Sequence, residues 1–462
     1  MKNETPKKTK RFLLFGILGA AAICVAAALL VFLGGEEMDP ATKTQLDAAG
    51  AAYQAGKFAD AAALYEKVNR LAPGNPEVLK QLGNIALLNN HIREAERFYR
   101  DALKATPWYT NIWPLTSELK YRLSLAYYRE DRFADAAAVI REAVGPAALG
   151  PLADLQGLGR QMELVAGQTP YDIEGPEESR IDFVITDPLP VVEVAVNDGS
   201  PKYFIVDTGG AEIILDDDLA EAAGAEIGGS LTGSYAGGKT AKTGLGRVDS
   251  ISIGDFRVRN VPIHTLDTDT WSSEFGMEIK GVVGTRFLMH FLSTIDYPGG
   301  SLILRRVGPA ALKSLDEQIV REGAKAIPFW LADLHTIVAW GTVNDLEPML
   351  FFVDTGLGGK GFTAPEPILN RAGITVDWTK AEEAVGGGTE KLKSVDILIR
   401  RLTLGAGSNE IAEYGVPGSA MEGSLGTLQG AMGFQIDGLI SHRFFRPHAL
   451  TLDFTGMRLI IH

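Results

Sequence analysis

The spacing of apolar and polar residues changes twice along the chain. Residues 12–34 are apolar throughout, with no charged residue and no proline. Residues 40–145 repeat themselves, with small, aromatic and proline residues returning at a fixed interval. Beyond residue 176, short apolar segments alternate with glycine-rich turns, a pattern typical of sandwich- or barrel-like β structure. The three patterns predict a multidomain chain with a transmembrane helix, an all-α repeat domain and an all-β domain.

The first pattern indicates a membrane anchor. About 20 apolar residues in a helix span the roughly 30 Å hydrocarbon layer of a bilayer. Basic residues precede the stretch and Glu36 and Glu37 follow it, and basic residues favour the cytoplasmic side. We therefore expect residues 1–11 to form a cytoplasmic tail, residues 12–34 to cross the lipid bilayer, and the bulk of the chain to lie on the periplasmic side of a bacterial inner membrane. A cleaved signal peptide is the alternative, although its apolar region is usually about 7–15 residues long.

The second pattern carries a repeat of 34 residues. Small residues let two antiparallel helices approach closely, and a proline ends the second helix. The repeated positions are Ala61, Tyr65 and Pro73, which return as Ala95, Tyr99 and Pro107, together with Ala49, which returns as Gly83. A third, displaced copy begins at Phe133. This arrangement resembles the tetratricopeptide repeat.

The tetratricopeptide resemblance implies that residues 40–145 stack into a helical surface that binds a protein partner. The alternative is that the repeats only space the next domain from the membrane. Residues 146–175 are rich in glycine, proline and alanine, and we expect a linker there that could hold one helix.

The amino-acid composition excludes several classes of partner and cofactor. The 462 residues include 58 acidic and 44 basic side chains, and the formal charge of −14 argues against a nucleic-acid partner, whose phosphates require a basic face. A single cysteine excludes an intramolecular disulfide and a cysteine-rich metal site. The seven histidines are scattered and no H-E-x-x-H motif occurs, so we expect neither a metal nor another cofactor.

An internal duplication distinguishes the third pattern. Residues 196–209 align without gaps on residues 343–356 with nine of fourteen positions identical, and each copy ends an apolar strand with Asp-Thr-Gly. Residues 281–288 correspond to residues 438–445, and a glycine-rich stretch separates the two matched segments in each copy. A single Asp-Thr-Gly would be weak evidence for a catalytic site, since aspartates commonly occur where strands end. Here the strand with Asp-Thr-Gly, the glycine-rich stretch and the second matched segment occur in the same order in both copies, and this combination is a specific signal.

These motifs resemble the aspartic peptidases of the pepsin and retropepsin superfamily. The resemblance implies an all-β, bilobed acid-protease fold with two retropepsin-like lobes at residues 176–306 and 326–462, joined by residues 307–325. It also implies that Asp207 and Asp354 form a catalytic dyad that hydrolyses peptide bonds in a polypeptide substrate.

The resemblance assigns roles to further residues. Those supporting the dyad would be Thr208, Gly209, Thr355, Gly356, Gly284 and Ser441. Those forming flaps over the substrate would be Tyr235, Gly237, Gly238, Gly386, Gly387 and Gly388. Ser441 stands where the first lobe has Gly284, which predicts slight crowding beside Asp354. A tyrosine at position 235 is also consistent with ordinary cross-strand packing.

Two carboxyl groups suit this chemistry for a physical reason. Carboxylates about 3 Å apart cannot both ionise, so the pair shares one proton. One member then takes a proton from water while the other polarises the scissile carbonyl. Gly210 and Leu357 follow the two motifs, where pepsins have a hydroxyl residue, and fewer donors stabilise the charge less. We therefore expect a raised dyad pKa and activity at weakly acidic to neutral pH.

Two nucleotide-binding motifs occur without their structural context. Residues 233–240 match the P-loop pattern, yet neither a buried strand before them nor a helix after them is predicted. Residues 356–361 match G-x-G-x-x-G, but Pro365 and Pro367 follow where a dinucleotide fold needs a helix. We therefore expect a membrane-anchored aspartic endopeptidase, and the alternative is a catalytically inactive scaffold of the cell envelope with the same fold.

Overall fold

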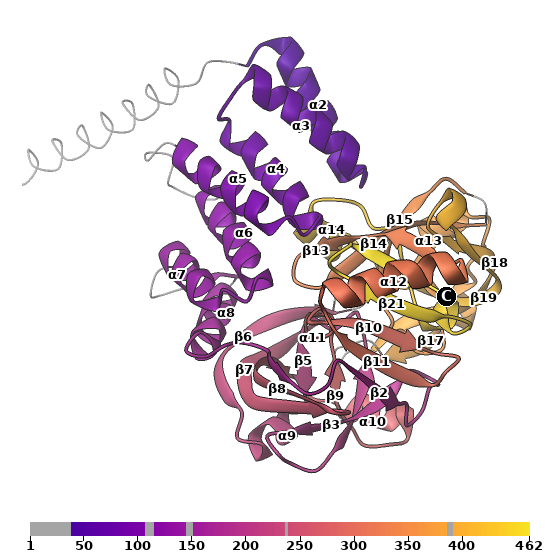
Figure 1. Cartoon of the computed structure of the whole chain (residues 1–462). Helices are drawn as coiled ribbons and strands as arrows, with labels where there is room; N and C mark the ends of the chain where they lie inside the picture. Colours follow the sequence, from indigo (N-terminus) through magenta and orange to yellow (C-terminus); the bar gives the residue numbers. More distant parts are fainter. Residues whose placement is uncertain (1–37, 107–114, 145–150, 236–238, 345, 386–390) are drawn as a thin grey trace, which may run out of the picture.

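A helical region lies along one side of a larger β-rich domain (Figure 1). The computed structural model describes residues 38–106, 115–144, 151–235, 239–344, 346–385 and 391–462. The helical region comes first in the chain and the β-rich domain follows, in the order that the sequence predicts.

The helical region contains three pairs of helices and one further helix within the described residues. The pairs are α2 (Pro40–Gln54) with α3 (Phe58–Leu71), α4 (Pro76–Leu88) with α5 (Ile92–Ala105), and α6 (Leu115–Arg129) with α7 (Phe133–Ala143), and α8 (Pro151–Val165) follows them. Helices α2 and α4 begin in the same way, because the side chains of Asp39 and Asn75 accept backbone N–H groups of the first turn and a proline follows each of them.

Small residues allow the paired helices to pack closely, as the repeat pattern predicts. A Cβ atom on Gly83 would lie 2.5 Å from the ring of Tyr99, closer than atoms can pack. The Tyr99 hydroxyl donates a hydrogen bond to Asn84 Oδ1 at 2.9 Å across the same pair. Ala61 and Ala95 are fully buried at equivalent places in two successive repeats.

Two eight-stranded sheets share the same topology in seven of their strands, and the eighth strand, β1 or β13, pairs at a different place in each. The first has the order β1-β8-β5-β9-β4-β3-β7-β6 and closes through β7 and β8; the second has the order β13-β14-β15-β20-β16-β19-β18-β17 and closes through β14 and β18. The first comprises β1 (Asp172–Glu174), β3 (Val191–Val196), β4 (Lys202–Val206), β5 (Ile213–Leu215), β6 (Glu226–Tyr235), β7 (Lys239–Ile253), β8 (Phe256–Thr265) and β9 (Ile279–Val283). The second comprises β13 (Trp330–Ala332), β14 (Thr336–Val343), β15 (Met349–Val353), β16 (Phe362–Pro365), β17 (Glu382–Val385), β18 (Lys391–Leu404), β19 (Ile411–Met421) and β20 (Gly438–Ile440).

A third sheet joins the two halves. Its order is β12-β22-β21-β10-β11-β2. The central strands β10 and β21 are antiparallel, and Thr294 pairs with Thr451, its counterpart in the duplication, with 2.7 Å between the hydroxyl oxygens. A pseudo-twofold axis therefore passes between these two threonines. The strands are β2 (Glu178–Asp182), β10 (Phe291–Asp296), β11 (Ser301–Arg306), β12 (Lys325–Pro328), β21 (Ala449–Asp453) and β22 (Arg458–Ile461).

Shorter helices complete the β-rich domain. Helix α12 (Pro309–Glu322) occupies most of the predicted inter-lobe connection, and its Leu315 packs on Leu292 and Ile460 of the third sheet. The others are α9 (Asp217–Ala222), α10 (Asp269–Phe275), α11 (Thr285–Leu288), α13 (Glu366–Arg371), α14 (Gly426–Met432), α15 (His442–Phe445) and the 3₁₀ helices η3 (Trp378–Lys380) and η4 (Gly407–Asn409).

The turns within the three helix pairs face the β-rich domain. Each turn holds one residue with positive φ: Gly56, Asn90 or Asp131. A Cβ on Gly56 would lie 3.0 Å from a methyl group of Leu350, and Asn90 Nδ2 donates to the Phe454 carbonyl at 3.4 Å. Asp131 Oδ1 accepts from an Arg286 guanidinium nitrogen at 2.7 Å. One edge of the helical stack therefore docks on the β-rich domain at every repeat.

The structure contradicts the predicted localisation. The tail at 1–11 and the span at 12–34 lie outside the described residues. Across the described ranges, no helix is long and apolar enough to cross a bilayer. The longest helices there, such as α2 and α8, have 15 residues, fewer than the roughly 20 that a spanning helix needs. A single-pass membrane protein with its bulk in the periplasm is therefore not supported.

Candidate active site

The two Asp-Thr-Gly motifs occupy equivalent places in the two eight-stranded sheets. Asp207 follows β4, which runs parallel to β9, and Asp354 follows β15, which runs parallel to β20. The Asp207 N–H donates to the Val283 carbonyl at 3.1 Å, and the Asp354 N–H donates to the Ile440 carbonyl at 3.0 Å. Each buried apolar strand therefore extends its ladder by one bond and places an aspartate where the strand ends.

The two carboxyl groups meet between the halves. They share a hydrogen bond. A Cβ on Gly209 would collide with the carboxyl of Asp354, and one on Gly356 would collide with the carboxyl of Asp207. Each glycine thus lies against the aspartate of the opposite half, and only a residue without a side chain fits there. The structure brings these four predicted residues together.

Two threonines tie the halves together beneath the carboxyl groups. Thr208 N donates to Thr355 Oγ1 at 2.9 Å, and Thr355 N donates to Thr208 Oγ1 at 3.1 Å. Each hydroxyl in turn donates to the strand of the other half, Thr208 to the Val353 carbonyl at 2.7 Å and Thr355 to the Val206 carbonyl at 3.5 Å. Both threonines are fully buried, so these reciprocal bonds fix the relative position of the two loops.

The surroundings of Asp207 and Asp354 raise the pKa of both carboxyl groups. Asp207 and Asp354 are both half-buried. Burial is the main cause that raises the pKa of Asp207, although the Gly209 N–H bond lowers it in part. Burial also raises the pKa of Asp354 well above its ordinary value, and the charge of Asp207 raises it further. Because the carboxyl groups interact so closely, the proton belongs to the pair as one titrating unit.

The position occupied by Gly284 in the first half is occupied by Ser441 in the second. A Cβ on Gly284 would collide with the Glu212 carbonyl oxygen. Ser441 is fully buried, and its Oγ accepts from the Leu357 N–H at 3.1 Å. Ser441 therefore adds a hydrogen bond to the loop that carries Asp354.

The loop lengths explain this difference. Ile214, seven residues after Asp207, pairs with Val282, whereas Thr363, nine residues after Asp354, pairs with the equivalent Leu439. The two additional residues in the second loop leave room for the serine side chain.

The predicted flaps correspond to two hairpins. Tyr235 is the last residue of β6 and pairs with Lys239 across the hairpin β6–β7. The corresponding hairpin in the second half is β17–β18. The glycines predicted for the flap tips, Gly237, Gly238, Gly386, Gly387 and Gly388, lie outside the described residues. Within the described residues, the P-loop pattern lies at the end of β6 and the start of β7, and β7 continues to Ile253.

One acidic group could be considered for a metal ion. Among the described residues, this group consists of three aspartates with one carboxylate oxygen each within 4.8 Å of the others: Asp216, Asp267 and Asp269. The Asp216 carboxylate already pairs with Lys280 Nζ at 2.9 Å and accepts from Thr268 Oγ1 at 2.8 Å. A lysine therefore supplies the positive charge that a cation would bring.

A buried polar cluster lies beside the Asp207 loop and was not predicted from the sequence. Glu212 is fully buried in the apolar segment that leads into β5, and Arg286 is nearly so in α11. The signal in the sequence was Glu212, a charged residue inside an otherwise apolar segment, which indicates a buried charge that needs a partner. Two members of the cluster, Tyr128 and Asp131, come from the helical region, which sequence spacing does not connect to this loop.

Comparison with known families agrees with this division of the chain. Residues 52–119 match the family model described as Tetratricopeptide repeat, and residues 192–287 match the model described as Aspartyl protease. The second match includes Asp207 and Gly284 but not the half that carries Asp354. The comparison with curated proteins finds no match. The family matches show a tetratricopeptide-like helical region and a β-rich, aspartyl-protease-like domain.

Two solved structures are similar to parts of the chain. The N-terminal domain of stress-induced protein-1 from C. elegans is 17% identical, with a TM-score of 0.25, over 28% of this chain and 99% of its own. A retropepsin-like aspartic protease from Rickettsia conorii is 20% identical, with a TM-score of 0.20, over 30% of this chain and 96% of its own. These low scores carry no further argument.

Proposed function

We propose that this protein is an aspartic endopeptidase that hydrolyses peptide bonds with a water molecule activated by Asp207 and Asp354. The observation that carries the proposal is the meeting of two carboxyl groups, one from each half, in a shared hydrogen bond. Their raised pKa favours a pair with one proton at a pH where isolated aspartates are ionised. Such a pair offers both the base and the acid that amide hydrolysis requires.

The reaction then follows general acid–base chemistry. The ionised carboxylate takes a proton from water, and the water oxygen bonds to the carbonyl carbon of the substrate. The protonated carboxyl donates its proton to the carbonyl oxygen, which gives a tetrahedral diol. When the diol collapses, one of its hydroxyl groups returns a proton to the ionised carboxylate, the C–N bond breaks, and the leaving nitrogen takes a proton from the protonated carboxyl. Bonds from Thr208 and Thr355 keep the two loops fixed during these steps.

The proposed substrate is an extended polypeptide lying between the two halves, at 176–306 and 326–462. The hairpins β6–β7 and β17–β18 can cover such a segment and add backbone hydrogen bonds to it. The helical region would dock the substrate or a partner protein. Its turns at Gly56, Asn90 and Asp131 already contact the β-rich domain, so docking would use the helix faces.

Replacement of either aspartate tests the proposal. We expect Asp207→Asn and Asp354→Asn each to lower the rate of cleavage of unfolded protein substrates by about 10²–10⁴-fold or more, because each removes a proton-transfer group. We also expect the activity of the unaltered protein to peak at weakly acidic to neutral pH, since both pKa values are raised. Cleavage is measured by gel and by mass spectrometry of the products.

Asp198→Asn is the matched control, because Asp198 lies on an exposed turn and its side chain is 72% exposed. A statine-type transition-state mimic should inhibit the unaltered protein. Equal product traces from all four proteins, or a rate that peaks well below pH 4, would count against the peptidase. Equal traces would instead favour a scaffold that keeps the protease-like fold.

A further inference from the structure

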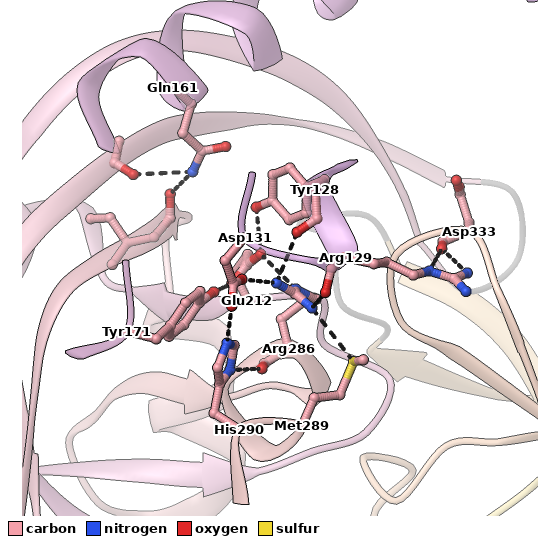
Figure 2. A network of polar contacts seen from close by, with 12 residues as sticks. Tyr128, Arg129, Asp131, Gln161, Tyr171, Glu212, Arg286, Met289, His290 and Asp333 are labelled. Atoms are coloured by element: carbon pink, nitrogen blue, oxygen red, sulfur yellow. Dashed lines mark hydrogen bonds and ion pairs between the residues drawn. The ribbon is translucent and has the colours of Figure 1, made fainter. Parts of the chain in front are cut away.

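A buried polar cluster connects the helical region to the Asp207 loop (Figure 2). It contains charged side chains from three segments: Asp131 from the turn after α6, Glu212 from the segment before β5, and Arg286 from α11. The side chain of Glu212 is 0% exposed and that of Arg286 is 1% exposed. Removing such charges from water costs several kcal/mol each, so the cluster requires good internal pairing.

Glu212 receives hydrogen bonds from both sides. The Tyr128 hydroxyl, from the C-terminal end of α6, donates to Glu212 Oε1 at 2.5 Å. The Tyr171 hydroxyl donates to Oε2. The Arg286 side chain approaches Oε1 to 3.8 Å from Nε. Each oxygen of the carboxyl therefore has a tyrosine partner, and one of these tyrosines belongs to the helical repeats.

Arg286 is held almost entirely by the end of α6. Its guanidinium donates to the Tyr128 carbonyl at 3.1 Å and to Asp131 Oδ1 at 2.7 Å. The second oxygen of Asp131 bonds to His290 Nε2 at 2.9 Å, and the ring of His290 stacks on Tyr171 with centroids 3.7 Å apart. The cluster thus closes on itself around the last turn of α6.

The backbone beside Glu212 and Arg286 supports the catalytic loop directly. Thr285 N donates to the Gly210 carbonyl at 2.9 Å, and Arg286 N donates to the Ala211 carbonyl at 2.8 Å. Thr285 Oγ1 donates to the Thr208 carbonyl at 2.8 Å. A displacement of Arg286 is therefore transmitted through these bonds to the loop of residues 207–212, and a displacement of Glu212 moves the end of that loop itself.

The described residues of the second half hold no equivalent of the cluster. Gly361 takes the place of Glu212 before β16, because it precedes the first residue of that strand just as Glu212 precedes Ile213. Arg443 takes the place of Arg286, but its side chain is 35% exposed and lies 3.9 Å from Asp187. The protease-like fold therefore forms its second catalytic loop without a buried Glu–Arg pair. The pair in the first half serves the contact with the helical region.

We infer that Glu212 and Arg286 are positioning residues through which the helical region holds the Asp207 loop in its working geometry. The catalytic part of this inference rests on the proposed function. The helical region would then act as a built-in part of the active site, in addition to any role in docking.

Tyr128→Phe tests the inference with a minimal change. It removes the hydroxyl that binds Glu212 and leaves the ring in place. We expect faster amide hydrogen exchange in the peptide that covers residues 207–212, and kcat lowered by about tenfold with KM nearly unchanged, because a buried hydrogen bond to the Glu212 carboxyl is lost. Tyr127→Phe is the matched control: the neighbouring hydroxyl is also hydrogen-bonded, but to Glu96 and Arg100 within the repeats.

Asp131→Asn is a second variant that keeps the turn, since asparagine tolerates the positive φ of 57° at this position. It removes the charge that faces Arg286, and we expect the same two effects. The inference is overturned if exchange at 207–212 in both variants equals that of the unaltered protein and of Tyr127→Phe. If the unaltered protein cleaves no substrate, the proposed function fails, and the exchange comparison still decides whether the helical region holds the loop.

Discussion

At the residue scale, Glu212 is a carboxyl whose titration should be visible near neutral pH. Burial raises the pKa of Glu212 from its ordinary 4.5 to about 7, against the lowering effects of Arg286 and the hydroxyls of Tyr128 and Tyr171; Asp131 raises it slightly. The folded protein therefore binds this proton more tightly than the unfolded chain. Between pH about 4.5 and 7, the free energy of unfolding must fall as pH rises.

Glu212→Gln removes this titration while keeping the shape of the side chain. We expect the stability of the unaltered protein, relative to the variant, to fall by roughly 3 kcal/mol between pH 4.5 and 8, since each pKa unit corresponds to about 1.4 kcal/mol. Denaturant unfolding at a series of pH values measures the difference. Parallel stability curves for the two proteins would show that Glu212 does not titrate in this range.

At the element scale, helix α8 packs on a hairpin that we propose as a flap. Gly157, in the middle of α8, meets strand β6 so closely that a Cβ would collide with the Ser230 carbonyl, and a Cβ on Gly229 would lie 2.6 Å from the Cα of Gly157. Gln161 Nε2 donates to the carbonyls of Gly246 at 3.0 Å and Ile263 at 2.8 Å (Figure 2). The segment predicted as a linker therefore supports the base of the hairpin.

Gly157→Ala should destabilise the protein, which is the opposite of the usual effect in a helix. Alanine normally stabilises a helix interior by about 0.5–1 kcal/mol over glycine. Here the added methyl group must displace β6, so we expect a loss of about 1–3 kcal/mol in denaturant unfolding and a severalfold higher KM. Gly167→Ala is the control, because nothing lies within 4 Å of a Cβ at that position. A variant at least as stable as the unaltered protein would refute the close contact.

The same elements show what the sequence can predict. The duplicated strand and Asp-Thr-Gly order implies two equivalent loops, and the meeting of Asp207 with Asp354 follows from that equivalence. The contact between Tyr128 and Glu212 joins residues 84 positions apart without any periodic pattern. The packing of α8 likewise depends on contact with the backbone of β6. Such contacts between different domains are set by the tertiary structure, so sequence spacing gave no signal for them.

At the scale of the whole molecule, the helical region and the β-rich domain share an apolar core. Phe58, at the start of α3, is 1% exposed and packs against the rings of Trp330 and Phe434, with centroids 5.3 and 4.9 Å apart. Tyr53 of α2 also packs on Phe434 at 5.9 Å. Added to the polar cluster at the end of α6, this core joins the helical stack to both halves of the duplication.

The two regions should therefore unfold together. Phe58→Ala removes a buried ring from the shared core and should cost about 3–5 kcal/mol, with the loss felt in both regions. Hydrogen exchange followed by mass spectrometry at rising denaturant should show peptides from α3–α5 and from β13–β15 opening at the same concentration, and shifting together in the variant. Leu71→Ala, at a side chain that is 55% exposed, should leave both unchanged. Independent opening of the helical peptides, with the β-rich domain unaffected by Phe58→Ala, would mean that the helical region is only attached to the protease-like domain.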